Sequence, residues 1–212
     1  MARDGVDRST LHAWLSARSI ARRLPLPVPD HGGFRVDTNS DTEIARWVFS
    51  EPAREISALA RAILEPRYFI KLCAPADALA AALPRCWALD APSYFMQRVS
   101  TGAARQPPDG YSMEIKQIGT IVEARILSPT GILAASGYAA ETEQVFVYDR
   151  IVTEPGHRRK GLGHALMQAL HDARRDTAKR ELLVATEDGR ALYSTLGWQT
   201  ISPYSSASIR EA

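Results

Sequence analysis

The sequence has few cysteines, little net charge and no long apolar run, and each shortage excludes a class of protein. Cys73 and Cys86 are the only cysteines; they form no CxxC pair and have no histidine at zinc-finger spacing. A disulfide framework or metal site is therefore not expected. A net charge of +2 argues for neither a nucleic-acid nor a membrane partner. No apolar run approaches the roughly 18 residues of a membrane-spanning helix, so we expect a cytoplasmic protein with reduced thiols.

The remaining composition is that of a folded soluble protein. Of the 212 residues, 45% are apolar and 24% are charged, which suffices for a core without covalent staples. This length permits one large domain or two small ones. The arginine-rich residues 1–24 lack the apolar run of a signal peptide, and we expect them to form a surface helix capped at Ser9 or Thr10.

The first hundred residues alternate between short helical and strand patterns. Prolines at alternate positions in 25–29, followed by Gly32 and Gly33, disfavour a helix and end that segment in a turn. A helical pattern begins at Asp41 and is divided in two by Pro52. The expected order is a strand at 34–37, helices at 41–48 and 56–64, a strand at 68–73, a helix at 76–83 and a strand at 94–99.

Residues 101–110 (TGAARQPPDG) are the best internal linker, and we divide the chain there into regions 1–105 and 106–212. Beyond the linker a β-meander precedes a helix whose apolar residues share one face. The expected elements are one or two strands over 112–127, strands at 132–138 and 145–153, a helix from 162 to 173, a strand at 182–185, a helix at 190–196 and a strand at 200–209.

A weak internal repeat relates the two regions. An offset of 111 residues places Trp87 on Trp198, Pro92 on Pro203 and Asp77 on Asp188. Both segments have the order helix, strand, short helix, tryptophan, proline, strand. We hypothesise that the N-terminal region is a degenerate copy of the C-terminal one, without the glycines of the latter.

The segment 145–164 combines a strand end, a loop with consecutive cations and two glycines, and a helix start. Glycines allow close approach of an anion to the backbone, and the first N–H groups and dipole of a helix favour negative charge. Arg158, Arg159 and Lys160 add charge-assisted donors. The pattern predicts a phosphate or pyrophosphate ligand.

Two common phosphate motifs do not fit this segment. The string GxxxxGK[ST] is absent. A dinucleotide fingerprint needs a third glycine where Leu166 stands, and Glu181, at the spacing of its acidic residue, begins a strand instead of ending one.

The segment Arg158-Arg159-Lys160-Gly161-Leu162-Gly163 resembles the acyl-CoA motif [R/Q]xxGx[G/A] of the GNAT family of N-acyltransferases. A second family signature, LYxxLG followed by an aromatic residue, is matched by residues 192–198 (LYSTLGW). The two motifs stand in the family's order, and the resemblance covers about 120–200. It implies an α/β (α+β) fold with a mixed, mostly antiparallel sheet flanked by helices, and acetyl-CoA as cosubstrate.

The resemblance also implies roles for individual residues. The backbone of Ile151, Val152 and Thr153 is expected to contact the pantetheine arm and to polarise the thioester carbonyl. The pyrophosphate is expected on Arg158, Arg159, Lys160, Gly161, Leu162, Gly163 and His164.

Proton transfer is assigned by the same resemblance. Tyr193 matches the residue that protonates the leaving thiolate. Asp149 and Glu187 are candidate acceptors of the amine proton, because the familiar glutamate of the family is replaced here by Val147. Asp149 also has a structural interpretation, in which it pairs with Arg150 or a neighbour.

Three functions compete at this point. The first is an N-acetyltransferase acting on a primary amine of a small molecule or peptide. The second is a non-catalytic acyl-CoA-binding or sensing module, and the third, a nucleic-acid-binding patch at 158–160, is disfavoured by the net charge. His157, His164 and His171 recur at every seventh position, but we expect solvated histidines and no metal. A homodimer is left open.

Overall fold

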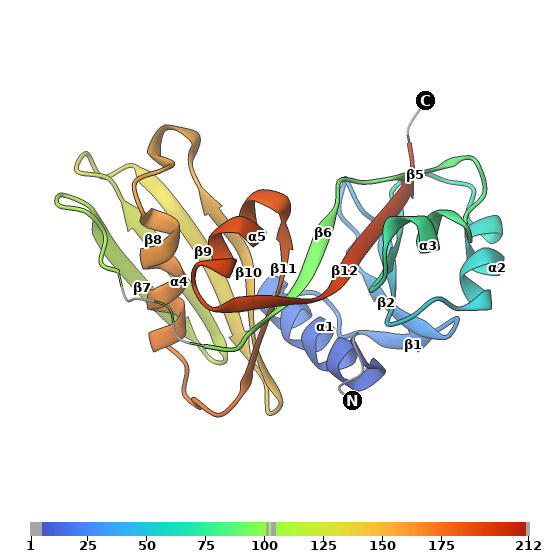
Figure 1. Ribbon diagram of the computed structural model, residues 1–212, viewed down its shortest axis with the longest axis horizontal. Coiled ribbons are helices and arrows are strands. Elements are labelled where there is room, and N and C mark those ends of the chain that lie inside the picture. Colours follow the sequence, from blue (N-terminus) through green and yellow to red (C-terminus); the bar gives the residue numbers. More distant parts are fainter. Residues whose placement is uncertain (1–5, 101, 103–104, 211–212) are drawn as a thin grey trace.

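The computed structural model describes residues 6–100, 102 and 105–210, in which the strands form one continuous, mixed and mostly antiparallel sheet (Figure 1). The strand order is β1-β2-β3-β4-β12-β6-β11-β10-β9-β8-β7, and β5 pairs with β12. The strands are β1 (Val28–Asp30), β2 (Gly33–Asp37), β3 (Ala45–Phe49), β4 (Tyr68–Leu72), β5 (Trp87–Leu89), β6 (Ser93–Arg98), β7 (Ser112–Ile118), β8 (Ile121–Leu127), β9 (Leu133–Glu141), β10 (Val145–Thr153), β11 (Arg180–Thr186) and β12 (Trp198–Ile209).

Helices flank this sheet, as expected from the resemblance. They are α1 (Arg8–Arg22), α2 (Arg54–Ala62), α3 (Ala76–Ala80), α4 (Leu162–Asp172) and α5 (Glu187–Ser194), with a 3-10 turn at Pro155–His157. Figure 1 shows two halves, one containing α2 and α3 and the other α4 and α5, with α1 where they meet. The α/β fold class predicted from the motifs is confirmed.

The two halves exchange strands. β6, from the N-terminal region, pairs with β11 of the C-terminal region. In return, β12 pairs with β6 through Trp198–Tyr204 and with β4 through Ser205–Ser208. The division at 105/106 therefore applies to the sequence alone, because the strands of the two regions belong to one hydrogen-bonded sheet.

The order of elements supports the hypothesis of a repeat. β3 runs parallel to β4 across α2, and β10 runs parallel to β11 across α4. Short helices follow, α3 and α5, and then Trp87 and Trp198 each begin a strand. We propose on this basis that residues 45–98 are a degenerate copy of residues 145–209.

The first helix differs from its prediction in cap and in burial. Asp7, and not Ser9 or Thr10, is the N-cap, because its carboxylate accepts a 2.9 Å hydrogen bond from the backbone N–H of Thr10. The helix is not a surface helix: Leu11 and Trp14 lie in a core cluster with residues from both halves of the sheet. The apolar face of α1 thus covers the place where the halves meet.

The helix predicted over 41–48 is wrong, and the chain there forms strand β3. Every residue of β3 is buried, because β2 and β4 flank it and both faces are covered. A short, fully buried apolar run has no period that separates strand from helix. The predicted helix after Pro52 is present as α2.

Three cations lie close together beneath α1. Arg18 of α1, Arg46 of β3 and Lys71 of β4 repel one another, and Arg46 pairs with Glu43. Burial, together with the charges of Arg46 and Arg18, lowers the pKa of Lys71 to about 8. The charged form of Lys71 therefore destabilises the folded state at neutral pH.

Replacing Lys71 with methionine is expected to raise the free energy of unfolding by about 1 kcal/mol at pH 7. The advantage of the methionine variant should be smaller at pH 10. Between the folded-state pKa of Lys71, about 8, and its ordinary pKa of 10.5, the unfolded wild type binds more protons than the folded wild type. The free energy of unfolding of the wild type therefore rises with pH in this range. Urea denaturation at both pH values measures this, with exposed Lys116→Met as the control. A loss of stability at pH 7 would contradict the prediction.

Candidate functional site

The parallel strands β10 and β11 separate at the centre of the C-terminal half. They pair only from Val145 with Arg180 to Val147 with Leu182, although both strands continue beyond. Between Asp149 and Val152 the pairing of β10 with β9 also shifts register, and Arg150 has a φ of 52°. Past Val147 the backbone of β10 has thus lost its partner on the β11 side, which leaves an opening in the sheet.

The three residues assigned to the pantetheine arm lie within this bulge and directly after it. Val152 is 45% exposed, and Ile151 packs across Gly137 of β9, where a Cβ atom would lie 2.5 Å from the Ile151 Cδ1. Thr153 ends the strand, and its carbonyl accepts a hydrogen bond from Arg158 Nε at 3.3 Å. The backbone from Ile151 to Thr153 therefore connects the opening with the loop that follows.

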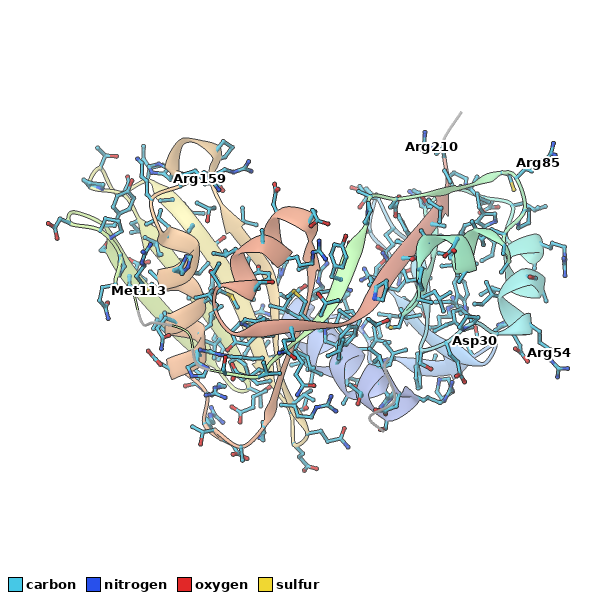
Figure 2. The ribbon with its side chains drawn as sticks, viewed as in Figure 1. Asp30, Arg54, Arg85, Met113, Arg159 and Arg210 are labelled. Atoms are coloured by element: carbon cyan, nitrogen blue, oxygen red, sulfur yellow. The ribbon has the colours of Figure 1, made fainter. Side chains whose placement is uncertain are left out.

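The predicted anion site lies at the N-terminus of α4. Gly161 is the N-cap residue with a φ of 79°, and no side chain caps the helix. Among the described residues, the N–H groups of Leu162 and Gly163 therefore lack intrahelical acceptors, whereas the N–H of His164 donates to the carbonyl of Gly161 at 3.1 Å. Arg158 and Lys160 are exposed beside them, and Arg159, with a φ of 62°, is seen at the edge of the molecule in Figure 2. These residues fit a pyrophosphate group.

The remaining residues of this motif set the packing of α4. Leu162 is fully buried. Gly163 has no room for a side chain, since a Cβ atom would lie 2.9 Å from Leu192 Cδ2 of α5. His164 faces Thr195 at 3.2 Å, and burial and the charge of Arg105 lower its pKa. The second glycine of the motif thus lets α4 and α5 pack closely.

Two residues near the anion site were missed in the sequence. Lys160 Nζ donates to the hydroxyl of Tyr111 at 3.1 Å, and that hydroxyl lies 2.9 Å from His157 Nδ1. The guanidinium of Arg105 lies 3.2 Å from the position of a Cβ atom on Gly161. Both residues come from the linker and strand around 105–111, and no local pattern relates them to a loop fifty residues later.

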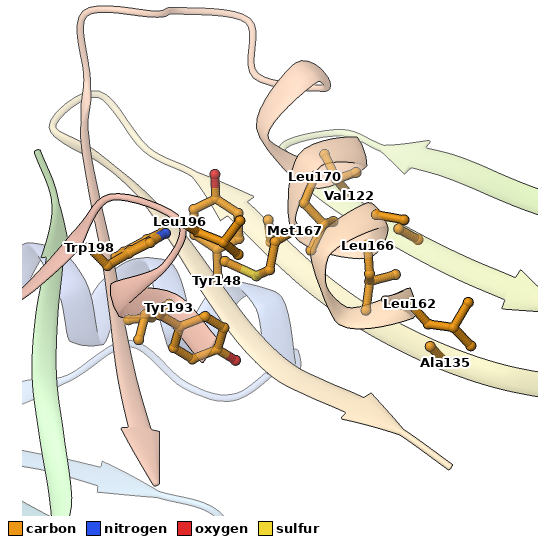
Figure 3. Packing of buried hydrophobic residues seen from close by; sticks show 14 of the residues in the cluster. Val122, Ala135, Tyr148, Leu162, Leu166, Met167, Leu170, Tyr193, Leu196 and Trp198 are labelled. Carbon is orange, nitrogen blue, oxygen red and sulfur yellow. The ribbon is translucent and has the colours of Figure 1, made fainter. Parts of the chain in front are cut away.

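Tyr193 of α5 faces the opening between β10 and β11. Figure 3 shows its hydroxyl pointing toward the gap where the two strands diverge. The ring packs near Trp198, with 6.2 Å between centroids, and the residue is only 7% exposed. Burial raises the pKa of Tyr193 well above its usual value. The phenol therefore stays protonated at neutral pH and is able to donate a proton.

Asp149 is held by arginines on the opposite face of β10. Its carboxylate accepts from Arg22 Nε at 2.5 Å and from Arg18 Nε at 3.3 Å, and Arg150 Nε lies 3.4 Å away. Burial raises its pKa, but the neighbouring guanidinium groups outweigh this, so the pKa lies below the ordinary value. These contacts favour the structural interpretation of Asp149, with α1 supplying two partners that the sequence did not reveal.

Glu187 begins α5 directly after β11. Its side chain is exposed, accepts a hydrogen bond from the hydroxyl of Tyr94 and pairs with Arg190. The hydrogen bond from Tyr94, together with Arg190, lowers the pKa of Glu187. Val147, at the position of the family's glutamate, is fully buried beneath α1.

The three regularly spaced histidines have separate partners. His157 contacts Tyr111, His164 contacts Thr195, and His171 Nδ1 lies 2.9 Å from Glu181. In the ranges that the structure describes, no group of His, Cys, Asp and Glu side chains is arranged to hold a metal ion. None of the helices in the same ranges is long and apolar enough to cross a membrane.

Known proteins share this fold. Residues 117–200 match the family model described as an acetyltransferase (GNAT) domain. The fold is similar to that of a GCN5-related N-acetyltransferase from Kribbella flavida, with 13% identity and a TM-score of 0.63 over 93% of this chain and 95% of that one. The fold is also similar to that of a GCN5-related N-acetyltransferase from Sphaerobacter thermophilus, with 10% identity and a TM-score of 0.57 over 85% of this chain and 78% of that one.

A tandem GNAT protein from the clavulanic acid biosynthesis pathway is also similar, with 14% identity and a TM-score of 0.50 over 74% of this chain and 68% of that one. The comparison with curated proteins gives no match. The resemblance that the two motifs predicted over about 120–200 is confirmed. Residues 117–200 thus match the GNAT acetyltransferase domain, and the fold of the chain is similar to that of GCN5-related N-acetyltransferases.

Proposed function

We propose that this protein is an acetyl-CoA-dependent N-acetyltransferase that acetylates a primary amine of a small molecule or peptide by direct transfer. One observation carries the proposal: the opening between β10 and β11 is faced by the protonated hydroxyl of Tyr193, and β10 leads from it to the uncapped N-terminus of α4. When bound, acetyl-CoA supplies an activated acetyl group as a thioester.

The residues of the chain supply binding and proton transfer. The N–H groups of Leu162 and Gly163 at the start of α4 and the cations at 158–160 hold a pyrophosphate. Backbone groups at Ile151–Thr153 bind the arm, and an N–H there stabilises negative charge on the reacting carbonyl. Tyr193 gives its proton to the leaving thiolate. Of the two candidate acceptors, we assign the amine proton to Glu187, acting through water, because its carboxylate is exposed although Arg190 pairs with it, whereas the carboxylate of Asp149 is buried between arginines.

Calorimetric titration with acetyl-CoA, with NADH as the control ligand, tests the binding part of this proposal. We expect micromolar binding of acetyl-CoA and no binding of NADH. A screen of primary amines for acetyl-CoA-dependent release of free thiol then tests catalysis. Binding without amine-dependent release would indicate the non-catalytic acyl-CoA module. If acetyl-CoA does not bind but a longer acyl-CoA does, the donor assignment is wrong and the pocket assignment stands.

Replacing Tyr193 with phenylalanine is expected to leave the Kd for acetyl-CoA unchanged and to lower kcat by about 10²-fold, a typical loss for a missing general acid. The ring still packs near Trp198, so the fold should persist. Tyr204→Phe is the matched control, since Tyr204 is also a buried phenol but lies in the cluster around α1. Steady-state kinetics on both variants measure the effect, and an unchanged kcat for Tyr193→Phe would remove this residue from the mechanism.

A further inference from the structure

A cavity of about 290 Å³ lies on the face of the sheet that α1 covers, opposite α4. The C-terminal turn of α1 forms one side of it, through Ala21, Arg22 and Arg23, and strands β7 to β10 form its floor. None of the residues assigned above to acetyl-CoA lines this cavity. It is therefore separate from the anion site at α4.

The floor of the cavity crosses the strands in a straight row that ends at the opening of the sheet. Lys116 is paired with Glu123, Glu123 with Tyr138, and Tyr138 with Asp149. Arg150 lines the inner end, three residues past the last β10–β11 pair at Val147. A molecule in this cavity thus reaches β10 from the α1 face at the level where the strands part.

Cations dominate the lining. Among the described residues that line the cavity, Arg22, Arg23, Lys116 and Arg150 are positively charged and Glu123 is the one carboxylate. That carboxylate is already engaged, because Glu123 accepts from the hydroxyl of Tyr138 at 3.2 Å and pairs with Arg125 at 3.4 Å. The lining therefore has an excess of positive charge.

Two of these cations are fixed in place with donors to spare. Arg22 uses Nε and one terminal nitrogen on Asp149. Arg150 stacks 3.8 Å over the ring of Tyr138 and donates to the carbonyl of Ala21 at 2.6 Å. A guanidinium has five N–H donors, so each arginine keeps donors for a ligand. Asp149 orients these donors by holding both arginines.

The other two cations are exposed at the mouth of the cavity. Among the contacts of the described residues, Arg23 and Lys116 have no carboxylate within ion-pair distance. Helix capping does not need the Arg23 side chain, since its backbone N–H bonds the carbonyl of Ile20 and that of Leu24 bonds the carbonyl of Ser19. Free cations beside oriented guanidinium groups suit an anionic ligand.

We infer that this cavity binds the acceptor of the reaction and selects amines that also carry an anionic group, a carboxylate or a phosphate. The inference rests on the proposed function, because it takes the opening between β10 and β11 as the place of transfer. Polycationic amines are excluded by repulsion from the four cations. Ile118 and Ile121 add apolar surface for the carbon chain between the two groups.

Matched pairs of amines test the inference. β-Alanine is compared with β-alaninamide for the carboxylate, and O-phosphoethanolamine with ethanolamine for the phosphate, by acetyl-CoA-dependent thiol release at constant ionic strength. The member that carries the carboxylate or phosphate is expected to have at least ten-fold higher kcat/KM in at least one pair, and that pair identifies the anion. If the members without an anionic group react equally well or better in both pairs, the inference is overturned.

Charge reversal locates the effect. Arg23→Glu and Lys116→Glu are each expected to raise the KM for the amine that carries the anionic group about ten-fold, with the Kd for acetyl-CoA unchanged. Arg85→Glu is the control, because it changes the net charge equally at the far end of the other half (Figure 2). The same KM in all three variants would overturn the assignment of this cavity.

If no amine in the panel is acetylated, this result counts against the proposed function and not against the cavity. The cavity is then tested by ligand binding without catalysis. Calorimetry then compares O-phosphoethanolamine with ethanolamine, and β-alanine with β-alaninamide, on the wild type and Lys116→Glu. Preferential binding of the member with the carboxylate or phosphate, weakened by Lys116→Glu, supports the anionic ligand. Equal binding within both pairs would overturn it.

Discussion

Replacing Gly161 with glutamate is expected to abolish acetyl-CoA binding without unfolding the protein. Gly161 caps α4 with a φ of 79°, and the guanidinium of Arg105 is the neighbour that a new side chain would meet. A carboxylate at this position is attracted to the helix N-terminus and to Arg105, so the fold tolerates it apart from about 1 kcal/mol of backbone strain. The same carboxylate occupies and neutralises the place assigned to the pyrophosphate.

Calorimetric titration measures this loss, for which the expected increase in Kd exceeds 10³-fold. Gly119→Glu is a matched control: Gly119 has a φ of 60°, with open space around its Cβ position, and it lies in the β7–β8 turn at the other end of the strands. It adds the same charge and a comparable strain. Micromolar binding by Gly161→Glu would show that the anion site is elsewhere.

Replacing Asp149 with asparagine is expected to lower the free energy of unfolding at pH 7 by about 3 kcal/mol, the lower end for breaking a buried ion pair from one side. The change removes the carboxylate that Arg18 and Arg22 share and leaves two partly buried guanidinium groups uncompensated. It also loosens the contact of α1 with β10. Urea denaturation measures the loss, and exposed Asp41→Asn is the control.

Acidification provides a second test of the same carboxylate. Its folded-state pKa lies below the ordinary value of 3.8, so its contribution to stability is complete above that value and is lost as pH falls through the folded-state pKa. The gap in stability between wild type and Asp149→Asn should therefore be constant near neutrality and narrow below about pH 4. If Asp149→Asn lowers the free energy of unfolding by less than 1 kcal/mol at pH 7, these ion pairs contribute no more than exposed surface ion pairs do, and the prediction is wrong.

Much of the C-terminal half was predictable because its signals are local. The glycines and cations at 158–163 and the apolar face of α4 depend on residues within a few turns of one another, and the strand–loop–helix order is present as predicted. The N-terminal half was harder. Strand β3 is short and buried on both faces, so its pattern has no period of its own, and the helix predicted there was wrong.

The candidate site shows the same division. The loop 158–164 and Tyr193 were found from their motifs, and the structure places the loop at the N-terminus of α4 and Tyr193 at the opening. Arg105 and Tyr111 were missed, because their approach to Gly161 and Lys160 depends on the path of the chain before β7. The arginine partners of Asp149 lie about 130 residues away on α1.

The sequence by itself therefore determined the family resemblance, the candidate anion loop and the order of elements from β7 to β12, since these follow from short-range patterns of glycine, charge and apolar spacing. Only the tertiary structure decided the exchange of β6 and β12 between the halves, the burial of α1, the ion pairs of Asp149 and the cationic cavity at Arg150. The physical reason is that strand pairing and ion pairing join residues far apart in the chain. Which residues become partners depends on which surfaces pack together in the folded protein, and local propensity does not predict this.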